Sequence, residues 1–232
     1  MNTDLFIENL FASLISGDRF SGRRLVDAAF DNGIDAGTLA REVFWPTISN
    51  ITTLYRQDQI TRLAQQYATR SLSTLVSQVQ ARYELAEARN RSICMFCGPD
   101  ELDDLAARLV ADLLEADGYT VFYGGGNIAH DDILAEVHER KPDVLLMFSA
   151  GGSDAPGLRQ LIDHVRGINA LPDMQIVVGG GVFSRAPGLA EEIGADLWAT
   201  GPEDLMEQLV QYPDVRADLE ERTVGRGKVK AA

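Results

Sequence analysis

The sequence predicts an α/β protein in which an N-terminal four-helix bundle precedes a five-stranded, doubly wound parallel sheet of Rossmann-like type with flavodoxin-like strand order. Two observations predict this architecture. Apolar residues repeat at helical spacing through roughly the first 90 residues. Beyond them, short continuous apolar runs alternate with amphipathic helices, which is typical of parallel strands covered on both faces. We therefore expect a bundle over 1–90, a sheet domain over 91–213 and a C-terminal tail over 214–232.

The bundle is predicted from four helical patterns joined by short connections. They cover residues 3–17, 21–33, 37–55 with a kink at Pro46, and 59–88. The strands are expected at 92–97, 119–124, 144–150, 176–181 and 196–200. The helices that alternate with them are expected at 101–116, 130–140, 156–168, 186–193 and 203–211.

Composition excludes several classes of protein. With 232 residues and a hydrophobic fraction of 45%, the chain can bury a sizeable core. A net charge of −14 disfavours direct nucleic-acid binding, which depends on cations that contact phosphates. The one basic cluster, Arg226, Lys228 and Lys230, is read as a solvated terminus. We see neither a membrane-spanning apolar stretch nor a signal peptide, so we expect no membrane partner and a cytoplasmic location.

The two cysteines, Cys94 and Cys97, fall inside one predicted strand. Two thiols without clustered histidines cannot complete the four ligands of a structural zinc site. Packing is the expected role of both side chains. A redox or ligand role, mainly for Cys97 at the end of the strand, is the alternative.

Glycine-rich turns follow three of the predicted strands, at 124–127, 149–154 and 179–183. Parallel sheets bind ligands at the carboxyl ends of their strands, where these turns gather. Glycine lets backbone approach a ligand closely, so the three clusters predict a large planar or phosphate-bearing ligand, with plain turn geometry as the alternative. The first turn, CGPDELDDLA, lacks the dinucleotide fingerprint, and no Walker motif occurs.

Several segments, in this order, resemble the cobalamin-binding module of methionine synthase, of corrinoid methyltransferase carriers and of cobalamin light-sensing regulators. The similarity extends over about residues 5–210. It is carried by PTISNITTLYRQDQITRLAQQYATRSL in the bundle, by ADLLEADGYTVFYGGGNIAHDDILAEVHERKPDVLLMFSA in the sheet, and by SAGG, VVGGGVF and EEIGADLWATGPEDL after it.

The resemblance implies a cofactor held between the bundle and the strand-end turns. The implied contacts are Tyr55, Gln65, Gln66, Asp103, Gly125, Asn127, Ser149, Gly151, Gly179 and Gly180. The family's D-x-H-x-x-G motif, whose histidine binds cobalt from below, falls on residues 101–106, so Asp103 stands in place of the histidine. The family's upper-face E-H pair becomes Gln65–Gln66, and its tryptophan becomes Tyr55. Cobalamin is therefore expected to bind without the usual axial histidine.

His130 is the candidate metal ligand, because it begins a helix directly after the second glycine-rich turn. A surface histidine is the alternative reading there. His138 and His164 lie within amphipathic helices and are expected on solvated faces.

These observations favour a sensory or regulatory tetrapyrrole-binding module, in transcription regulation or photoreception, that signals to a regulatory protein partner or to another copy of the chain. Cobalamin is the expected ligand, with haem or a bilin as alternatives. Two other functions stay open: a corrinoid carrier subunit of a methyltransferase or mutase, and a ligand-free scaffold for protein contacts. We expect no independent catalysis, because the sequence shows no conventional nucleophile and base, metal cluster or phosphate loop.

Overall fold

The computed structural model describes residues 3–217. The predicted basic cluster at 226–230 and most of the predicted tail lie outside the described residues. The backbone forms two compact units that interleave along the chain. We call them the bundle unit, Met1–Ala88 with Asp104–Gly118, and the sheet unit, Arg89–Asp103 with Tyr119–Ala232.

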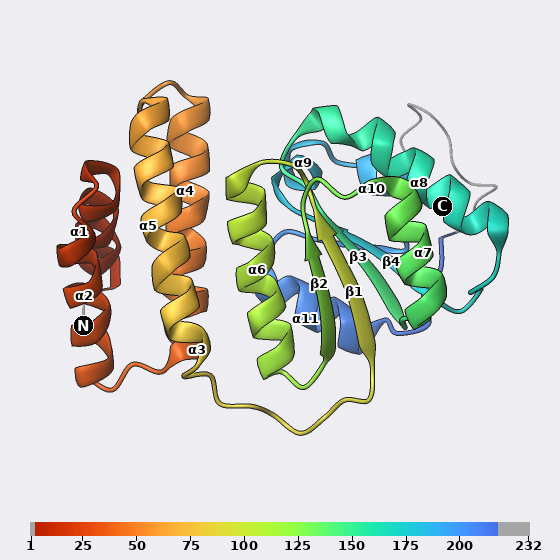
Figure 1. The fold of residues 1–232 in the computed structure, drawn as a ribbon, viewed down its shortest axis with the longest axis horizontal. Helices are drawn as coiled ribbons and strands as arrows, with labels where there is room; N and C mark the ends of the chain where they lie inside the picture. Colours follow the sequence, from red (N-terminus) through yellow and green to blue (C-terminus); the bar gives the residue numbers. More distant parts are fainter. Residues whose placement is uncertain (1–2, 218–232) are drawn as a thin grey trace, which may run out of the picture. The chain divides into compact units, whose positions relative to one another are not determined.

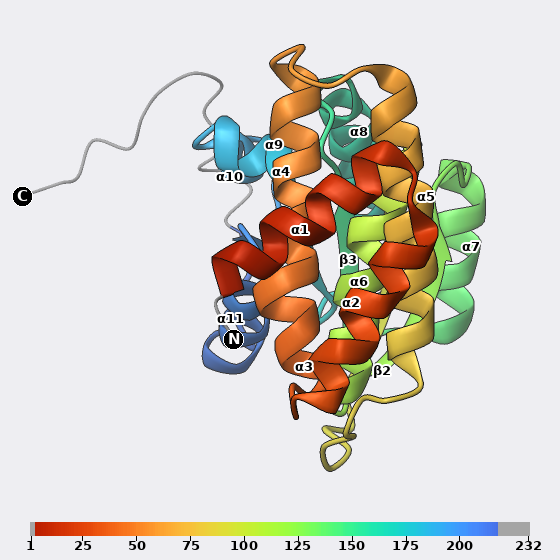
Figure 2. The same ribbon diagram turned by 90° about the vertical axis from the view of Figure 1, so that its left-hand side faces the viewer.

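The bundle unit consists of helices that pack against one another through apolar faces (Figures 1 and 2). Asp18 caps the helix that begins at Arg19, because its carboxylate accepts a hydrogen bond from the backbone N–H of Ser21 at 3.1 Å. Thr61 caps the helix that begins at Arg62, because its hydroxyl accepts a hydrogen bond from the backbone N–H of Ala64 at 3.2 Å. The elements are α1 Thr3–Ser16, α2 Arg19–Asp31, α3 Ala36–Leu39, η1 Ala40–Phe44, α4 Trp45–Arg56, α5 Arg62–Gln80 and the larger part of α6 Glu101–Ala116.

Two features of the bundle differ from the sequence-based expectation. The predicted third helix is divided by the π-helical turn η1, which ends two residues before Pro46. Because proline has no N–H, it cannot make the regular helical hydrogen bond to the preceding turn, and the helix is irregular there. The fourth helix was expected to reach Ala88, and this was wrong, because α5 ends at Gln80. Leu85, in the segment that follows, is 77% exposed, so a longer helix would have had no apolar face to bury.

The sheet unit contains five parallel strands in the order β2-β1-β3-β4-β5, which confirms the predicted fold class and strand order. The strands are β1 Ser92–Cys97, β2 Thr120–Gly125, β3 Val144–Phe148, β4 Gln175–Gly179 and β5 Leu197–Ala199. The remaining helices are α7 His130–Arg140, η2 Gly152–Asp154, α8 Ala155–Ile168, α9 Gly181–Arg185, α10 Leu189–Ile193 and α11 Pro202–Gln211.

One predicted helix, 186–193, was wrong in extent, since the structure has two short helices, α9 and α10, in this region. Pro187 and Gly188 separate them, and Gly188 has a left-handed backbone (φ +87°) that a continuing helix does not allow.

The core of the sheet unit confirms that Cys94 is a packing residue. Its side chain is fully buried among Phe96, Leu145 and Met147 on the face covered by α7 and α8. Burial raises the pKa of the Cys94 thiol to about 11, so the reactive thiolate is scarce at neutral pH. Cys97 is half-buried, with its sulfur 3.6 Å from the Tyr123 hydroxyl.

A buried carboxyl group joins α5 to α6 within the bundle unit. Asp112 is 4% exposed, and its Oδ1 accepts a hydrogen bond from the Gln80 amide at 2.8 Å. Its Oδ2 has no partner among the described residues. Burial, with a smaller contribution from the charge of Glu115, raises the pKa of Asp112 to about 7.

We expect Asp112→Asn to stabilise the protein at alkaline but not at acidic pH. Folded Asp112 keeps its proton up to about pH 7, whereas the unfolded carboxyl loses it near pH 4. The folded chain therefore binds more protons between these values, and the wild-type free energy of unfolding falls as pH rises through this interval. In urea unfolding, the variant should exceed wild type by about 1–3 kcal/mol at pH 8 and match it at pH 4. Asp27→Asn, at an exposed position of α2, is the control, and equal pH profiles for the two variants would contradict this account.

Candidate ligand site at the carboxyl ends of the strands

The turns after the strands pack closely on one another, and two glycines allow this. A Cβ added to Gly126 would lie 2.3 Å from the carbonyl oxygen of Gly98. A Cβ added to Gly180, whose φ is +102°, would lie 2.2 Å from the carbonyl oxygen of Ser149. Glycine at these two positions is therefore required by contact between neighbouring turns, whether or not a ligand binds.

Other predicted glycine contacts have different surroundings. A Cβ added to Gly179 would make ordinary van der Waals contacts, the nearest at 3.5 Å from the Phe148 ring. A Cβ added to Gly151 would lie 3.0 Å from the Asp154 carboxylate, which is a tight contact. A Cβ added to Gly152, in the same turn as Gly151, would have no atom within 4 Å. The turn after β3 thus has open space at Gly152, where a ligand could approach the backbone.

Asp103 lies in the first turn of α6 and is engaged within the protein. Its side chain is 3% exposed, and Oδ2 accepts a hydrogen bond from the Ala150 N–H at 3.3 Å. Arg185 donates to the carbonyl oxygen of the same Ala150 at 2.5 Å. The carboxyl group of Asp103 therefore helps to fix the turn after β3.

A second carboxylate lies beside Asp103. A Cβ on Gly98 would lie 2.5 Å from Asp103 Oδ2 and 3.1 Å from Asp154 Oδ2, so both carboxylates pack against the same glycine. Burial is the main cause that raises the pKa of Asp103 to about 6, and the hydrogen bond from Ala150 opposes it. The nearby charges of Asp100 and Asp154 add to the increase.

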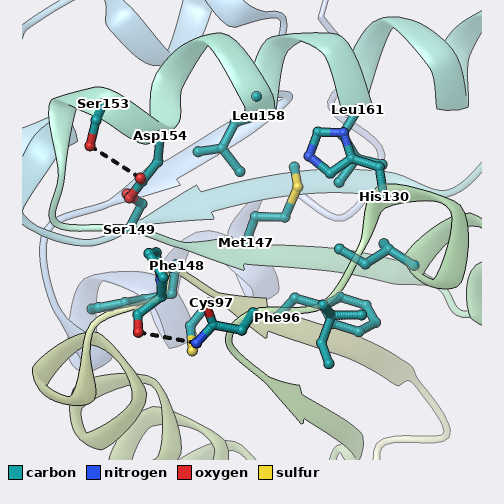
Figure 3. A pocket seen from close by; sticks show the side chains of 16 residues that line it. Phe96, Cys97, His130, Met147, Phe148, Ser149, Ser153, Asp154, Leu158 and Leu161 are labelled. Carbon is teal, nitrogen blue, oxygen red and sulfur yellow. Dashed lines mark hydrogen bonds between the residues drawn. The ribbon is translucent and has the colours of Figure 1, made fainter.

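A cavity of about 250 Å³ opens at the carboxyl ends of β1 and β3, between α7 and α8 (Figure 3). Phe96 and Met147 come from the strands, and Leu158 and Leu161 come from α8. The complete lining is Phe96, Cys97, Gly98, Pro99, Asn127, Ile128, His130, Ile133, Met147, Phe148, Ser149, Ser153, Asp154, Gly157, Leu158 and Leu161.

Polar groups gather at one end of this cavity. Ser149 Oγ donates to Asp154 Oδ2 at 2.7 Å, and Ser153 Oγ donates to Asp154 Oδ1 at 3.3 Å. His130, the first residue of α7, presents its ring toward α8, where a Cβ on Gly157 would lie 3.6 Å from its Nε2. In Figure 3 the imidazole and the Asp154 carboxylate come from opposite ends of the labelled group of residues.

The structure brings some of the predicted site residues together. Asn127, Ser149 and His130 line the cavity. Gly151 and Asp103 do not line the cavity. They lie close to it, because Gly151 packs against the Asp154 carboxylate and Asp103 shares the contact with Gly98. Gly125 and Gly180 have positive φ at the ends of their strands, which supports a role in the turns.

The three predicted contacts from the bundle belong to the other unit. Tyr55 lies in the last turn of α4, and Gln65 and Gln66 lie in the first two turns of α5; all three are half-buried. Their contact with a cofactor stays a prediction. His138 and His164 are exposed on α7 and α8, as expected.

Sequence reasoning missed Asp154, Phe96, Met147 and Gly157 as site residues. Asp154 had a usable signal, because it ends the glycine-rich turn after the third predicted strand, at the edge of the sheet where ligands bind. Within residues 3–217 no group of three or more histidine, cysteine or acidic side chains is arranged to hold a metal ion, and no helix is long and apolar enough to cross a membrane. His130 therefore stays a candidate only for a metal that arrives with a cofactor.

Comparison with known proteins identifies the family of residues 91–210, which comprise the strands of the sheet unit and α6. The model of the B12 binding domain family matches residues 91–210. No curated protein matches the chain. Among solved structures, the monomethylamine corrinoid protein of Methanosarcina barkeri is 16% identical with a TM-score of 0.77, and the alignment covers 91% of this chain and 99% of that one.

Two further solved structures align less closely. A cobalamin-binding protein from Desulfitobacterium hafniense DCB-2 is 15% identical, with a TM-score of 0.48 and coverage of 89% of this chain and 98% of that one. The methanol:cobalamin methyltransferase complex of Methanosarcina barkeri is 16% identical, with a TM-score of 0.46 and coverage of 94% and 84%. At these identities the structural likeness concerns the fold, but the family match covers more than half of the sequence, and the chain therefore belongs to the B12 binding domain family.

Proposed function

We propose that this protein binds cobalamin at the carboxyl ends of its strands and presents it to a protein partner, as a corrinoid carrier subunit. The family match over residues 91–210 carries the proposal. The full-length fold likeness to a corrinoid protein, at a TM-score of 0.77, supports the carrier role over the sensory role that the sequence favoured. None of the three structures named above is described as a sensor or as a haem or bilin protein.

The residues at the strand ends fit a corrinoid that has no axial ligand from the first turn. Ser149, Gly151 and Gly152 form a turn with open space beside Gly152. Asp103 stands where the family's histidine is expected, and its carboxyl group is buried and hydrogen-bonded to Ala150. We therefore expect cobalt to receive no lower ligand from Asp103. Cobalamin would supply the methyl-transfer chemistry, and the protein would bind, orient and shield it.

An absorption spectrum tests the proposal. The purified chain is mixed with hydroxocobalamin, haem or biliverdin, separated by gel filtration and measured in the visible range. We expect cobalamin alone to co-elute, with a spectrum that is the same in Asp103→Asn, because the Asp103 carboxyl group is hydrogen-bonded to Ala150 within the protein. His130→Ala decides whether His130 replaces the missing ligand, since loss of a metal bond would shift the bands and weaken binding more than about tenfold. Co-elution of haem or biliverdin in place of cobalamin, or of none of the three, would refute the proposed function.

A sensory module is the second candidate, and Asp103 is the observation that favours it. A carrier must handle cobalt in more than one oxidation state, and residues around the metal help to control that change. A chain without the first-turn histidine suits a receptor that holds one cofactor state. A light-dependent change in the elution volume of the adenosylcobalamin complex would favour the sensor, and its absence would favour the carrier.

A further inference from the structure

We propose that the outer face of α2 is a self-association surface, on which the α2 helix of a second copy of this chain lies antiparallel. A two-fold axis would relate the two copies, and oppositely charged side chains of the two helices would pair across it. The contact involves the bundle unit alone and needs no cofactor. It therefore goes beyond the proposed function and is tested separately from it.

The inner face of α2 packs on α1 and α5. A Cβ added to Gly22 would lie 3.4 Å from Ser13 Oγ of α1 and 3.7 Å from Leu75 Cδ1 of α5. The buried residues of α2 are Gly22, Val26 and Ala29. Because they recur every three or four residues, they define one side of the helix and leave the opposite side turned away from these two neighbours.

The outer face of α2 combines an aromatic side chain with unpaired charges. Its exposed residues at helical spacing along one side are Phe20, Arg24, Asp27 and Asp31. Phe20 is 64% exposed, and the Arg24 guanidinium lies over its ring at 5.9 Å from the centroid. Within residues 3–217, the side chains of Arg24, Asp27 and Asp31 form no ion pair. These charges are therefore open to a partner.

The charges of α2 run against the preference of an isolated helix. Beyond the capping residue Asp18, the first turn contains Arg19 and no acid, and the last turn contains Asp31 and no base. The amino end of a helix favours anions and the carboxyl end favours cations, because the peptide dipoles align along the axis. A second, antiparallel α2 compensates for this arrangement, since its acidic carboxyl end lies beside the arginines and its dipole points the other way.

The sequence of α2 favours one register for such a pair. When the two helices are centred between Leu25 and Val26, Arg24 of each copy lies opposite Asp27 of the other, so the two-fold axis makes the same ion pair twice. In this register Phe20 reaches the exposed Ala28 of the second copy. Aromatic and arginine side chains of this kind are common at the centres of protein interfaces.

The contact should be weak and sensitive to salt. It uses one helix of 13 residues, which is small beside the roughly 1,200–2,000 Å² that stable interfaces bury. Its ion pairs lie at the surface, where dissolved salt screens them. We therefore expect a dimer that forms at high protein concentration and dissociates when salt is added.

The experiment measures the mass of the cofactor-free chain by sedimentation equilibrium in low-salt buffer, from low to high micromolar concentration. The proteins are wild type, Arg24→Asp, Asp27→Arg and the double variant with both changes. Arg62→Asp is the matched control, because it makes the same charge change at an exposed position of α5 in the same unit. Circular dichroism and thermal unfolding verify that each protein is folded.

Wild type and Arg62→Asp should approach twice the monomer mass as concentration rises. Arg24→Asp and Asp27→Arg should each weaken association at least tenfold, because either change places like charges opposite each other at both symmetry-related positions. The double variant exchanges the two charges and keeps them complementary. It should therefore recover association.

Mixing the two single variants tests the pairing itself. The Arg24→Asp copy has acids at both positions and the Asp27→Arg copy has arginines at both, so the mixed pair regains both ion pairs. The two variants, which associate poorly alone, should therefore associate with each other at least as tightly as wild type does with itself. Sedimentation velocity with one variant fluorescently labelled measures this.

Two results would overturn the inference. One is a wild type that stays monomeric at the highest concentration. The other is a wild-type dimer that Arg24→Asp does not weaken or that the mixture of single variants does not restore, since the contact would then lie elsewhere. No arm measures cobalamin, so loss of the proposed function and loss of this contact are distinguishable.

Discussion

Asp196→Ala should lower the free energy of unfolding by about 3–5 kcal/mol. The Asp196 side chain is completely buried, and its Oδ1 lies 2.5 Å from Arg166 Nη2. It also accepts hydrogen bonds from the backbone N–H groups of Ile176 and Ala217, each at 2.6 Å. Alanine would leave the largely buried Arg166 guanidinium and a strand N–H without this partner, and such losses are costly away from water. Urea unfolding at neutral pH measures the effect.

An exposed ion pair on α8, the helix that carries Arg166, is the matched control. Asp163 lies 3.7 Å from Arg159 with 47% of its side chain exposed, so Asp163→Ala should change stability by less than about 1 kcal/mol. Equal losses in the two variants would show that Asp196 does not anchor α8 to the sheet. Because Asp196 bonds to Ile176 at the amino end of β4, the folded Asp196→Ala protein should keep wild-type cobalamin affinity.

Gly180→Ala should be destabilising by about 3 kcal/mol or more, and it should also disturb the ligand site. The φ of +102° is unfavourable for any residue with a Cβ. The new Cβ would lie 2.2 Å from Ser149 O and 2.7 Å from Ser149 C, which are backbone atoms and cannot rotate away. The turn after β3 would have to move, so cobalamin affinity should fall together with stability.

Gly152→Ala is the control for Gly180→Ala, because it adds the same methyl group to the neighbouring turn in open space. Its stability should stay within about 0.5 kcal/mol of wild type. If Gly180→Ala yields no folded protein, Gly179→Ala provides the comparison, since its Cβ would make contacts no closer than 3.5 Å. A Gly180→Ala protein as stable as Gly152→Ala would contradict the close approach of these two turns.

The fold was predictable because buried parallel strands are continuous apolar runs. The first strand was placed at its observed bounds, and the others within a few residues. The error at 81–88 has a physical cause, since alanine and glutamate favour a helix locally but every side chain of the segment except the half-buried Tyr83 is exposed, so packing does not stabilise a helix there. Helix propensity alone could not decide where α5 ends.

The site was less predictable, because its decisive contacts join residues far apart in the sequence. Asp103 and Ala150 are 47 positions apart, and nothing in either segment indicates that they bond. The glycine clusters were a sound signal for the strand ends, but they could not reveal that Gly126 and Gly180 accommodate protein backbone. The Phe96 and Met147 side chains looked like ordinary core residues, since alternation in a strand does not distinguish a core from a cavity wall.

The interleaving of the two units has a consequence for recombining this protein. The bundle unit includes Asp104–Gly118, so the chain crosses between the units three times and no single cut separates them. Within the bundle unit, α6 is bound to α5 through Arg108 with Ser73 and through Asp112 with Gln80. A gene fragment that starts at residue 91 would carry α6 without these partners. Fusion or exchange of the cofactor-binding half should therefore succeed only when the helical half travels with it.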